Sequence, residues 1–164
     1  MTMQPAGTEI QPDDLSARTL AVIAEHDALE GPLLPILHGI QDEFGYVPRG
    51  SLPIIAEALN ISNAEAHGVA TFYHDYRAAP AGRHVLKLCQ AEACQSMGSD
   101  NVAAMVKQAL GIGFHETTKD GSVTLEPIYC LGLCACAPSA LLDGKPIGRV
   151  DAEAVEEIVA QVCR

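Results

Sequence analysis

The sequence predicts an α+β protein in which a helical N-terminal part precedes a part that alternates strands and helices. Apolar residues recur at helical spacing over residues 14–76, which is typical of short amphipathic helices. From His84 onward, short apolar runs alternate with helical patterns, and turn residues separate them. Between Tyr76 and His84 the chain is rich in Pro, Gly and Ala, a composition that favours a boundary. We therefore expect two domains, at residues 1–78 and 79–164.

Four short helices are predicted in the N-terminal domain. The clearest one ends before Gly45, because glycine readily adopts the left-handed backbone that closes a helix. Its apolar stripe consists of Leu33, Leu37, Ile40 and Phe44. A third helix is expected over residues 52–59. Ser62 and Glu65 have the spacing of a capping box, in which each side chain binds a free backbone N–H, and they predict a fourth helix toward Thr71.

The C-terminal domain is expected to contain a small sheet. The predicted strands are 85–88, which ends on Cys89, then 123–129, 140–142 and 146–150. The last two strands form a hairpin about Asp143 and Gly144, which are typical turn residues.

Two longer helices are expected to cover this sheet. Ser99 or Asp100 is a suitable cap for a helix that ends near Leu110. Asp151 is expected to cap the last helix, whose apolar residues fall on one face. This face consists of Val155, Ile158, Val159 and Val162.

Composition excludes several classes of function. The 164 residues include 21 acidic and 10 basic side chains, with a formal net charge of −11 and 4% aromatic residues. Such a charge repels phosphate backbones and anionic membranes, so we expect no nucleic-acid partner. The start of the chain lacks a secretion signal and no run reaches roughly 18 apolar residues, so we expect a cytoplasmic protein without membrane insertion. In a reducing cytosol, the six cysteines point to a metal site rather than to disulfides.

Four of the cysteines form two close pairs, each at the end of a predicted strand. Cys89 and Cys94 are five residues apart, and Cys130 and Cys134 are four apart. A [2Fe-2S] cluster needs four thiolates, and two loops at neighbouring strand ends supply such a set. Apolar residues in both loops exclude water, namely Ala91, Ala93, Leu131, Leu133 and Ala135. Gly98 and Gly132 are expected to let backbone N–H groups approach sulfur.

Other interpretations of the cysteines fit the pattern less well. Zinc pairs usually have two residues between the cysteines, and neither pair here does. A redox dithiol needs the same spacing, whereas Cys134 and Cys136 have one residue between them. An alternative ligand set that uses Cys136 stays open. His67 and His74 lie outside both cysteine loops, so we expect no histidine ligand. No nucleophile with a base and no nucleotide-binding loop is present, so we expect no catalytic residue.

Several stretches of the chain resemble the thioredoxin-like [2Fe-2S] subunit family that complex I, NAD-reducing hydrogenases and NAD-dependent formate dehydrogenases share. These stretches are GPLLPILHGIQDEFGYVP at residues 31–48, HGVATFYH at residues 67–74, and the cysteine loops together with Ala137-Pro138. The sequence CQAEACQSMG at residues 89–98 most resembles the corresponding loop in the gamma subunit of a cytoplasmic formate dehydrogenase that contains molybdenum or tungsten.

The resemblance implies an N-terminal four-helix docking region followed by a thioredoxin-like [2Fe-2S] ferredoxin domain. It implies that Cys89, Cys94, Cys130 and Cys134 are the ligands of one cluster, which exchanges electrons with the FMN of a beta-type partner subunit that binds NAD. Formate is then oxidised in a catalytic alpha-type subunit, and the further iron–sulfur clusters and the molybdenum or tungsten cofactor belong to partner subunits. The alternatives are the equivalent subunit of complex I or of an NAD-reducing hydrogenase and, from another class, a zinc-stabilised interaction module.

Overall fold

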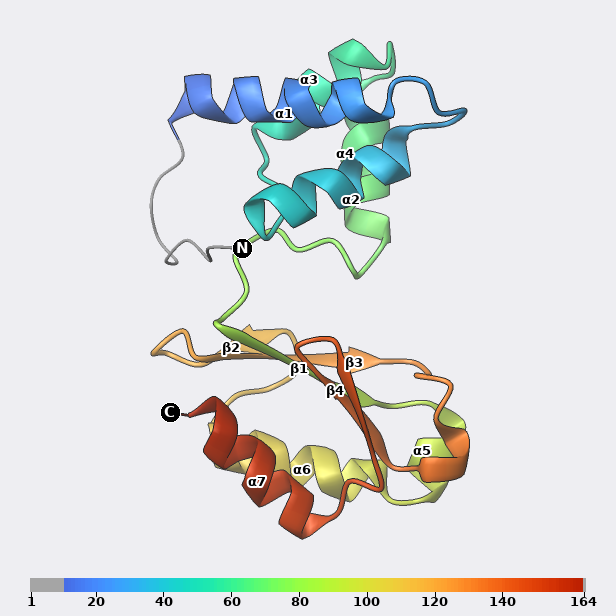
Figure 1. Ribbon diagram of the computed structural model, residues 1–164, viewed down its shortest axis with the longest axis vertical. Coiled ribbons are helices and arrows are strands. Elements are labelled where there is room, and N and C mark those ends of the chain that lie inside the picture. Colours follow the sequence, from blue (N-terminus) through green and yellow to red (C-terminus); the bar gives the residue numbers. More distant parts are fainter. Residues whose placement is uncertain (1–10, 164) are drawn as a thin grey trace. The chain divides into compact units, whose positions relative to one another are not determined.

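The computed structural model describes residues 11–163. The chain divides after Pro80 into two compact units, each with its own hydrophobic core, and Figure 1 shows the elements of both. The first ten residues, which entered the expectation of a cytoplasmic protein, lie outside the described part. Among the described residues, no helix is both long enough and apolar enough to cross a membrane.

The N-terminal unit consists of four helices over its described residues, as predicted. They are α1 (Pro12–His26), α2 (Leu33–Phe44), α3 (Ser51–Ala58) and α4 (Asn63–Phe72). Helix α1 packs on α2 and α3, and α3 packs on α4. The fully buried side chains at the centre of this unit include Ile36, Leu37, Ile40 and Ile55. Leu37 and Ile40 of the predicted stripe lie at this centre together with Ile36, whereas Leu33 and Phe44 are only partly buried and pack against it.

The predicted helix ends in the N-terminal unit are confirmed. Gly45 has φ 81° and its N–H donates to the carbonyl of Gln41, so it closes α2 in the left-handed conformation. At the start of α4, Ser62 Oγ accepts from the Glu65 N–H at 3.2 Å. The Glu65 carboxylate accepts in return from the Ser62 N–H at 2.8 Å. This is the reciprocal arrangement of a capping box.

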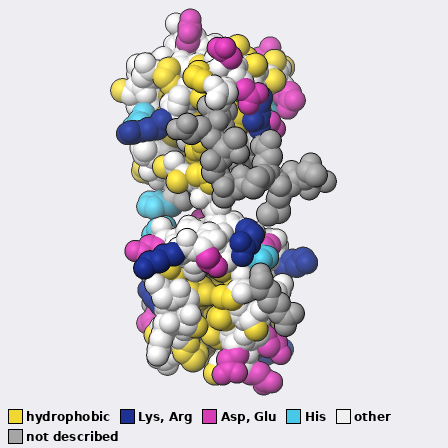
Figure 2. All heavy atoms as spheres, turned by 90° about the vertical axis from the view of Figure 1, so that its left-hand side faces the viewer, with side chains coloured by type: hydrophobic (Ala, Val, Ile, Leu, Met, Phe, Trp, Pro, Cys, Tyr) yellow, Lys and Arg dark blue, Asp and Glu magenta, His cyan; other side chains and the backbone are white. Residues whose placement is uncertain are grey.

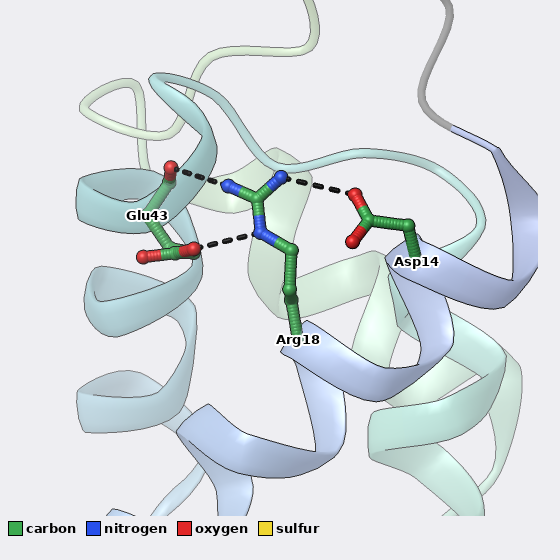
Figure 3. Close-up of polar contacts among 3 residues, drawn as sticks. All are labelled: Asp14, Arg18 and Glu43. Carbon is green, nitrogen blue, oxygen red and sulfur yellow. Dashed lines mark hydrogen bonds and ion pairs between the residues drawn. The ribbon is translucent and has the colours of Figure 1, made fainter. Parts of the chain in front are cut away.

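Arg18 links α1 to the end of α2 through hydrogen bonds and ion pairs, as Figure 3 shows. Its Nε lies 2.7 Å from Glu43 Oε1, and its Nη1 lies 3.3 Å from Asp14 Oδ2. A third hydrogen bond reaches the Glu43 carbonyl at 3.2 Å, and the guanidinium group lies 4.3 Å from the centre of the Phe44 ring. One cation therefore bridges the two helices through both polar and aromatic contacts.

The C-terminal unit is a five-stranded sheet with the strand order β2-β3-β1-β4-β5. Its strands are β1 (His84–Cys89), β2 (Glu116–Thr117), β3 (Val123–Ile128), β4 (Ser139–Leu142) and β5 (Lys145–Gly148). Strands β1 and β3 are parallel, and the other neighbours are antiparallel. The predicted α+β class is confirmed. The two-residue strand β2 was not predicted, because it is too short for a periodic pattern.

Two long helices cover one face of this sheet in Figure 1, α6 (Ser99–Leu110) and α7 (Ala152–Val162). Their apolar faces enclose a core with Leu86, Val106, Leu125 and Ile158. Figure 2 shows hydrophobic side chains gathered in the C-terminal unit on the face that it draws, with charged side chains around them. The core of this unit therefore lies between the sheet and a single layer of helices.

The two predicted helix starts in this unit have different outcomes. Asp151 caps α7, since its Oδ1 accepts from the Ala154 N–H at 3.0 Å. The prediction that Ser99 or Asp100 caps α6 is wrong, because Gly98 is the residue before the helix and Ser99 is its first residue. Gly98 has φ 92°, a conformation that favours glycine, and it connects α6 directly to a short preceding helix.

Candidate metal centre

The cysteine pairs meet because β1 and β3 run parallel in a fixed register. Cys89, the last residue of β1, lies opposite Ile128, the last residue of β3. Neighbouring strands lie about 4.8 Å apart, so the loops that leave these two ends start side by side. Cys130 follows Ile128 by two residues in the second of these loops.

A short helix, α5 (Glu92–Ser96), returns Cys94 toward the end of β1. Cys89 and Cys94 are both buried, and the Cys94 side chain helps to lower the pKa of Cys89. In the second loop, the sulfurs of Cys130 and Cys134 lie 3.8 Å apart, and both residues are exposed. The site therefore has an inner buried pair and an outer exposed pair.

Electrostatic interactions join the two pairs into one group. The pKa of Cys134 is raised, first by its hydrogen bond with Cys130 and then by the charge of that thiol. The charges of Cys94 and Cys89 raise it further. Thiols so close together resist ionising at the same time unless positive charge joins them, and iron ions would supply that charge.

Backbone N–H groups from both loops approach the cysteine sulfurs. Burial opposes ionisation of Cys89, but hydrogen bonds from the backbone of Ala91, Cys130 and Leu131 and from Cys94 outweigh it and lower the pKa of Cys89. The Gly132 N–H lies 3.4 Å from Cys130 Sγ, as expected of this glycine. Gly98 differs from the expectation, because its N–H donates to the Gln95 carbonyl at 2.9 Å. Four cysteines with donors aimed at sulfur fit a thiolate-bound iron cluster.

The second loop has an unusual backbone next to two of these donors. Cys130 has φ 92° and Gly132 has φ 73°. A positive φ is uncommon for a residue other than glycine, and it occurs in the segment whose backbone at Cys130 and Leu131 helps to lower the pKa of Cys89. The unusual backbone at Cys130 is therefore part of the site.

Cys136 lies in a turn of 3-10 helix, Cys134–Cys136, and packs against β5. A Cβ atom placed on Gly148 would lie 2.7 Å from the Cys136 Cβ and 3.8 Å from its sulfur. The Cys136 carbonyl accepts from the Arg149 N–H at 2.7 Å.

The other metal-binding side chains of the described residues do not form a second candidate centre. His67 and His74 are exposed residues of the N-terminal unit. Among the described residues, no three His, Cys, Asp or Glu side chains already converge closely enough to hold a single metal ion. The four cysteines are thus the candidate site, as two neighbouring pairs.

Three features near the candidate motifs were missed or misjudged from sequence. Of the neighbouring aromatic residues Phe72, Tyr73 and Tyr76, only Tyr76 is buried, while Phe72 is 73% exposed and Tyr73 is also exposed. Tyr129, which directly precedes Cys130, is 74% exposed. Ser139 is buried with its hydroxyl beside Cys94. Its place directly after Ala137-Pro138 is the only sequence signal that could have drawn attention to it.

The chain matches one known protein family over most of its length. The model of the thioredoxin-like [2Fe-2S] ferredoxin family matches residues 19–163. The chain belongs to this family. Its defining cofactor is a [2Fe-2S] cluster, in agreement with the cysteines at the sheet edge.

Relatives within the thioredoxin-like [2Fe-2S] ferredoxin family have roles in two kinds of complex. The chain is 38% identical to the E subunit of the NADH-quinone oxidoreductase of Pseudomonas aeruginosa, over 73% of this chain and 72% of the relative. It is 30% identical to the HndA subunit of the NADP-reducing hydrogenase of Solidesulfovibrio fructosivorans, over 93% of this chain and 89% of the relative. It spans 60% of the length of the corresponding NADH-quinone oxidoreductase subunit of Mycobacterium bovis, with 34% identity.

A solved structure shares the fold. A chain of an NAD+-reducing [NiFe]-hydrogenase in the H2-reduced state superposes with a TM-score of 0.68 and 23% sequence identity. The match covers 80% of this chain and 22% of the hydrogenase chain. This likeness supports the arrangement of elements described above.

Proposed function

We propose that this chain is the [2Fe-2S] electron-transfer subunit of a cytoplasmic NAD-linked oxidoreductase complex of the complex I or NAD(P)-reducing hydrogenase kind. The observation that carries the proposal is the set of four cysteines, Cys89, Cys94, Cys130 and Cys134, which two strand ends and their loops bring to one edge of the sheet. Relatives named as subunits of NADH-quinone oxidoreductase and of NADP-reducing hydrogenase support the type of complex.

Each cysteine pair has its own part in the proposed site. When bound, the cluster takes up and releases one electron at a time. Cys89 and Cys94 hold it from the buried side, where backbone N–H groups offset the negative charge of the sulfurs. Cys130 and Cys134 leave the other side near the surface. An electron would be exchanged there with the FMN of a partner subunit, which would also bind NAD.

Formate dehydrogenase is the second candidate for the complex. This candidate is supported by the sequence CQAEACQSMG at residues 89–98, which contains the first cysteine pair. In that case a catalytic alpha-type subunit with molybdenum or tungsten would oxidise formate, and this chain would still exchange electrons with the flavin of a beta-type subunit. The same cysteines are the ligands in either complex.

Activity of the native complex distinguishes these candidates. The chain is tagged, purified from its host with its partners, and assayed with NADH and quinone, with hydrogen and NAD(P), and with formate and NAD. Activity with formate alone would assign the chain to a formate dehydrogenase and would overturn the leading proposal for the complex. Activity in either of the other assays, without formate activity, is the result that the leading proposal expects.

The cluster itself is tested on the purified chain. We expect a brown protein with two iron and two sulfide ions per chain and an EPR signal of a spin-half centre after reduction. Substitution Cys94→Ala or Cys130→Ala should abolish this signal. A colourless protein with about one zinc ion per chain would instead support the zinc-stabilised interaction module.

A further inference from the structure

Ser139 places a buried hydroxyl group beside one of the candidate ligands. Its Oγ lies 3.5 Å from Cys94 Sγ, a hydrogen-bonding distance for sulfur. Ser139 is 3% exposed and Cys94 is 2% exposed. Among the described residues, Cys94 Sγ is the hydrogen-bond partner of this hydroxyl.

The sheet determines where this hydroxyl lies. Ser139 is the first residue of β4, and the next residue, Ala140, pairs with Leu88 of β1. On its other side, Ser139 pairs with Gly148 of β5. Because Ser139 pairs with β5 and the next residue pairs with β1, its backbone is fixed by the sheet, and its hydroxyl lies beside the sulfur of Cys94.

The direction of the hydrogen bond follows from the chemistry of the ligand. A cysteine that binds iron is a thiolate and has no proton to donate. The hydroxyl of Ser139 has one proton, so it must be the donor to Cys94 Sγ. Both residues are buried, and in such surroundings a hydrogen bond to a charged group is stronger than in water.

We propose that Ser139 is a positioning residue that donates a hydrogen bond to the Cys94 thiolate and raises the reduction potential of the cluster. The inference rests on the proposed cluster. Reduction adds one electron and therefore increases the negative charge on the sulfurs. A fixed donor stabilises the more negative state more strongly, and so it favours reduction.

Potentiometric titration of the purified full-length protein tests the inference, with the EPR signal of the reduced cluster as the readout. We expect Ser139→Ala to keep the cluster but to make reduction about three to ten times less favourable. Since a tenfold change corresponds to 59 mV for a one-electron couple, the potential should fall by about 30 to 60 mV. An intact cluster with an unchanged potential would overturn the proposal.

A pair of matched variants separates the hydroxyl from the shape of the side chain. Ser139→Thr keeps a hydroxyl, whereas Ser139→Val has nearly the same shape without one. We expect Thr to retain the potential of the unaltered protein and Val to lower it. If Ser139→Ala loses its cluster, the comparison of Ser139→Thr with Ser139→Val still tests the proposal. Equal reduction potentials in these two variants would overturn the role of the hydroxyl.

Ser122 supplies a control at the opposite end of β3 from Cys130. It is also a buried serine, and its Oγ donates to Asp120 Oδ1 at 2.8 Å. Ser122→Ala should leave the potential unchanged, and a fall equal to that of Ser139→Ala would overturn a specific role for Ser139. Absence of any iron–sulfur signal in the unaltered protein would contradict the proposed function itself, which distinguishes the two failures.

Discussion

The environments of Cys134 and Cys136 differ although one residue separates them. Cys134 forms a sulfur–sulfur contact of 3.8 Å with Cys130. Cys136 packs against Gly148, and its carbonyl binds the backbone of Arg149. Spacing alone leaves either cysteine as a ligand, whereas the local packing favours Cys134. Cys134 thus faces the other candidate ligands, whereas Cys136 faces β5.

Substitution of these two cysteines is predicted to have opposite results. Cys136→Ala should retain the absorption and EPR signals of the cluster, because its side chain faces β5. Cys134→Ala should abolish or rearrange them, because it removes one of the four thiolates. Both variants are measured by visible absorption and iron content after the same purification. Loss of iron in Cys136→Ala with retention in Cys134→Ala would move the fourth ligand to Cys136.

At the residue scale, the candidate ligands were predictable and their surroundings were not. The close spacing of Cys89 to Cys94 and of Cys130 to Cys134 is visible in the sequence. The hydroxyl of Ser139 reaches Cys94 only through pairing of β4 with β1. Such long-range pairing leaves no local pattern, so a buried serine that starts a strand is indistinguishable from any other serine in the sequence.

The capping box that begins α4 makes its stability depend on pH. Hydrogen bonds from the Ser62 backbone and side chain lower the pKa of Glu65 below its ordinary value of 4.5. A carboxylate with a lowered pKa stabilises the folded state above the ordinary pKa, and this contribution is lost as the pH falls through the lowered value. The helix start should therefore weaken below about pH 4.5.

Substitution Glu65→Gln is predicted to destabilise the protein at pH 7 and to have a smaller effect as the pH falls below 4.5. The charge that the variant lacks is then also lost from the unaltered protein. Urea unfolding followed by circular dichroism at several pH values measures this. Ser62→Ala, which removes the cap, should cost about 1 kcal/mol at neutral pH. An effect of Glu65→Gln that grows in acid would contradict the capping role.

Gly148 allows β5 to approach the loop of Cys136. A Cβ atom at this position would lie 2.7 Å from the Cys136 Cβ and 3.2 Å from its carbonyl oxygen. We expect Gly148→Ala to destabilise the C-terminal unit by about 1 to 3 kcal/mol, the usual cost of overpacking. Gly113→Ala is the control, because its Cβ would meet only the flexible carboxylate of Glu116, at 3.3 Å. Equal thermal stability of the two variants would contradict this close approach.

At the scale of elements, long periodic segments were predictable and short ones were not. Helices α2 and α4 were predicted from their stripe and caps, because several residues of each helix carry the signal. Helix α5 has five residues, which is fewer than two helical turns. Strand β2 has two residues, too few to show an alternation of apolar and polar side chains. The parallel pairing of β1 with β3 could not be predicted from the sequence pattern either, because periodicity identifies a strand but not the strand that pairs with it.

At the scale of the whole molecule, the chain has two separate cores. The core of the N-terminal unit lies among α1, α2 and α3, and that of the C-terminal unit lies between the sheet and its two long helices. All four candidate ligands belong to the C-terminal unit. A unit with its own core is expected to fold alone, so we expect the candidate site to form without the helical unit.

A fragment with residues 79–164 is therefore predicted to fold and to bind the cluster without the N-terminal domain. We expect an EPR signal like that of the full chain and a cooperative unfolding transition. The fragment should fail to assemble with the flavin-bearing subunit, because the proposed docking region is missing. Retention of full assembly would assign docking to the C-terminal unit instead, and an unfolded fragment would contradict the division into independent domains.

The parallel register of β1 and β3 has a consequence for the variation that this protein tolerates. The two cysteine pairs are brought together by strand ends that pair directly, and not by the length of the chain that joins them. Residues inserted after α6, near Gly111, would lengthen this connection without moving Cys89 relative to Ile128. Because doubling a flexible loop costs only about 0.6 kcal/mol, a segment added at the exposed Gly111, before Ile112 and Phe114 pack against the core, should leave the candidate site intact. The loop after α6 is therefore a suitable position for an inserted label or affinity tag.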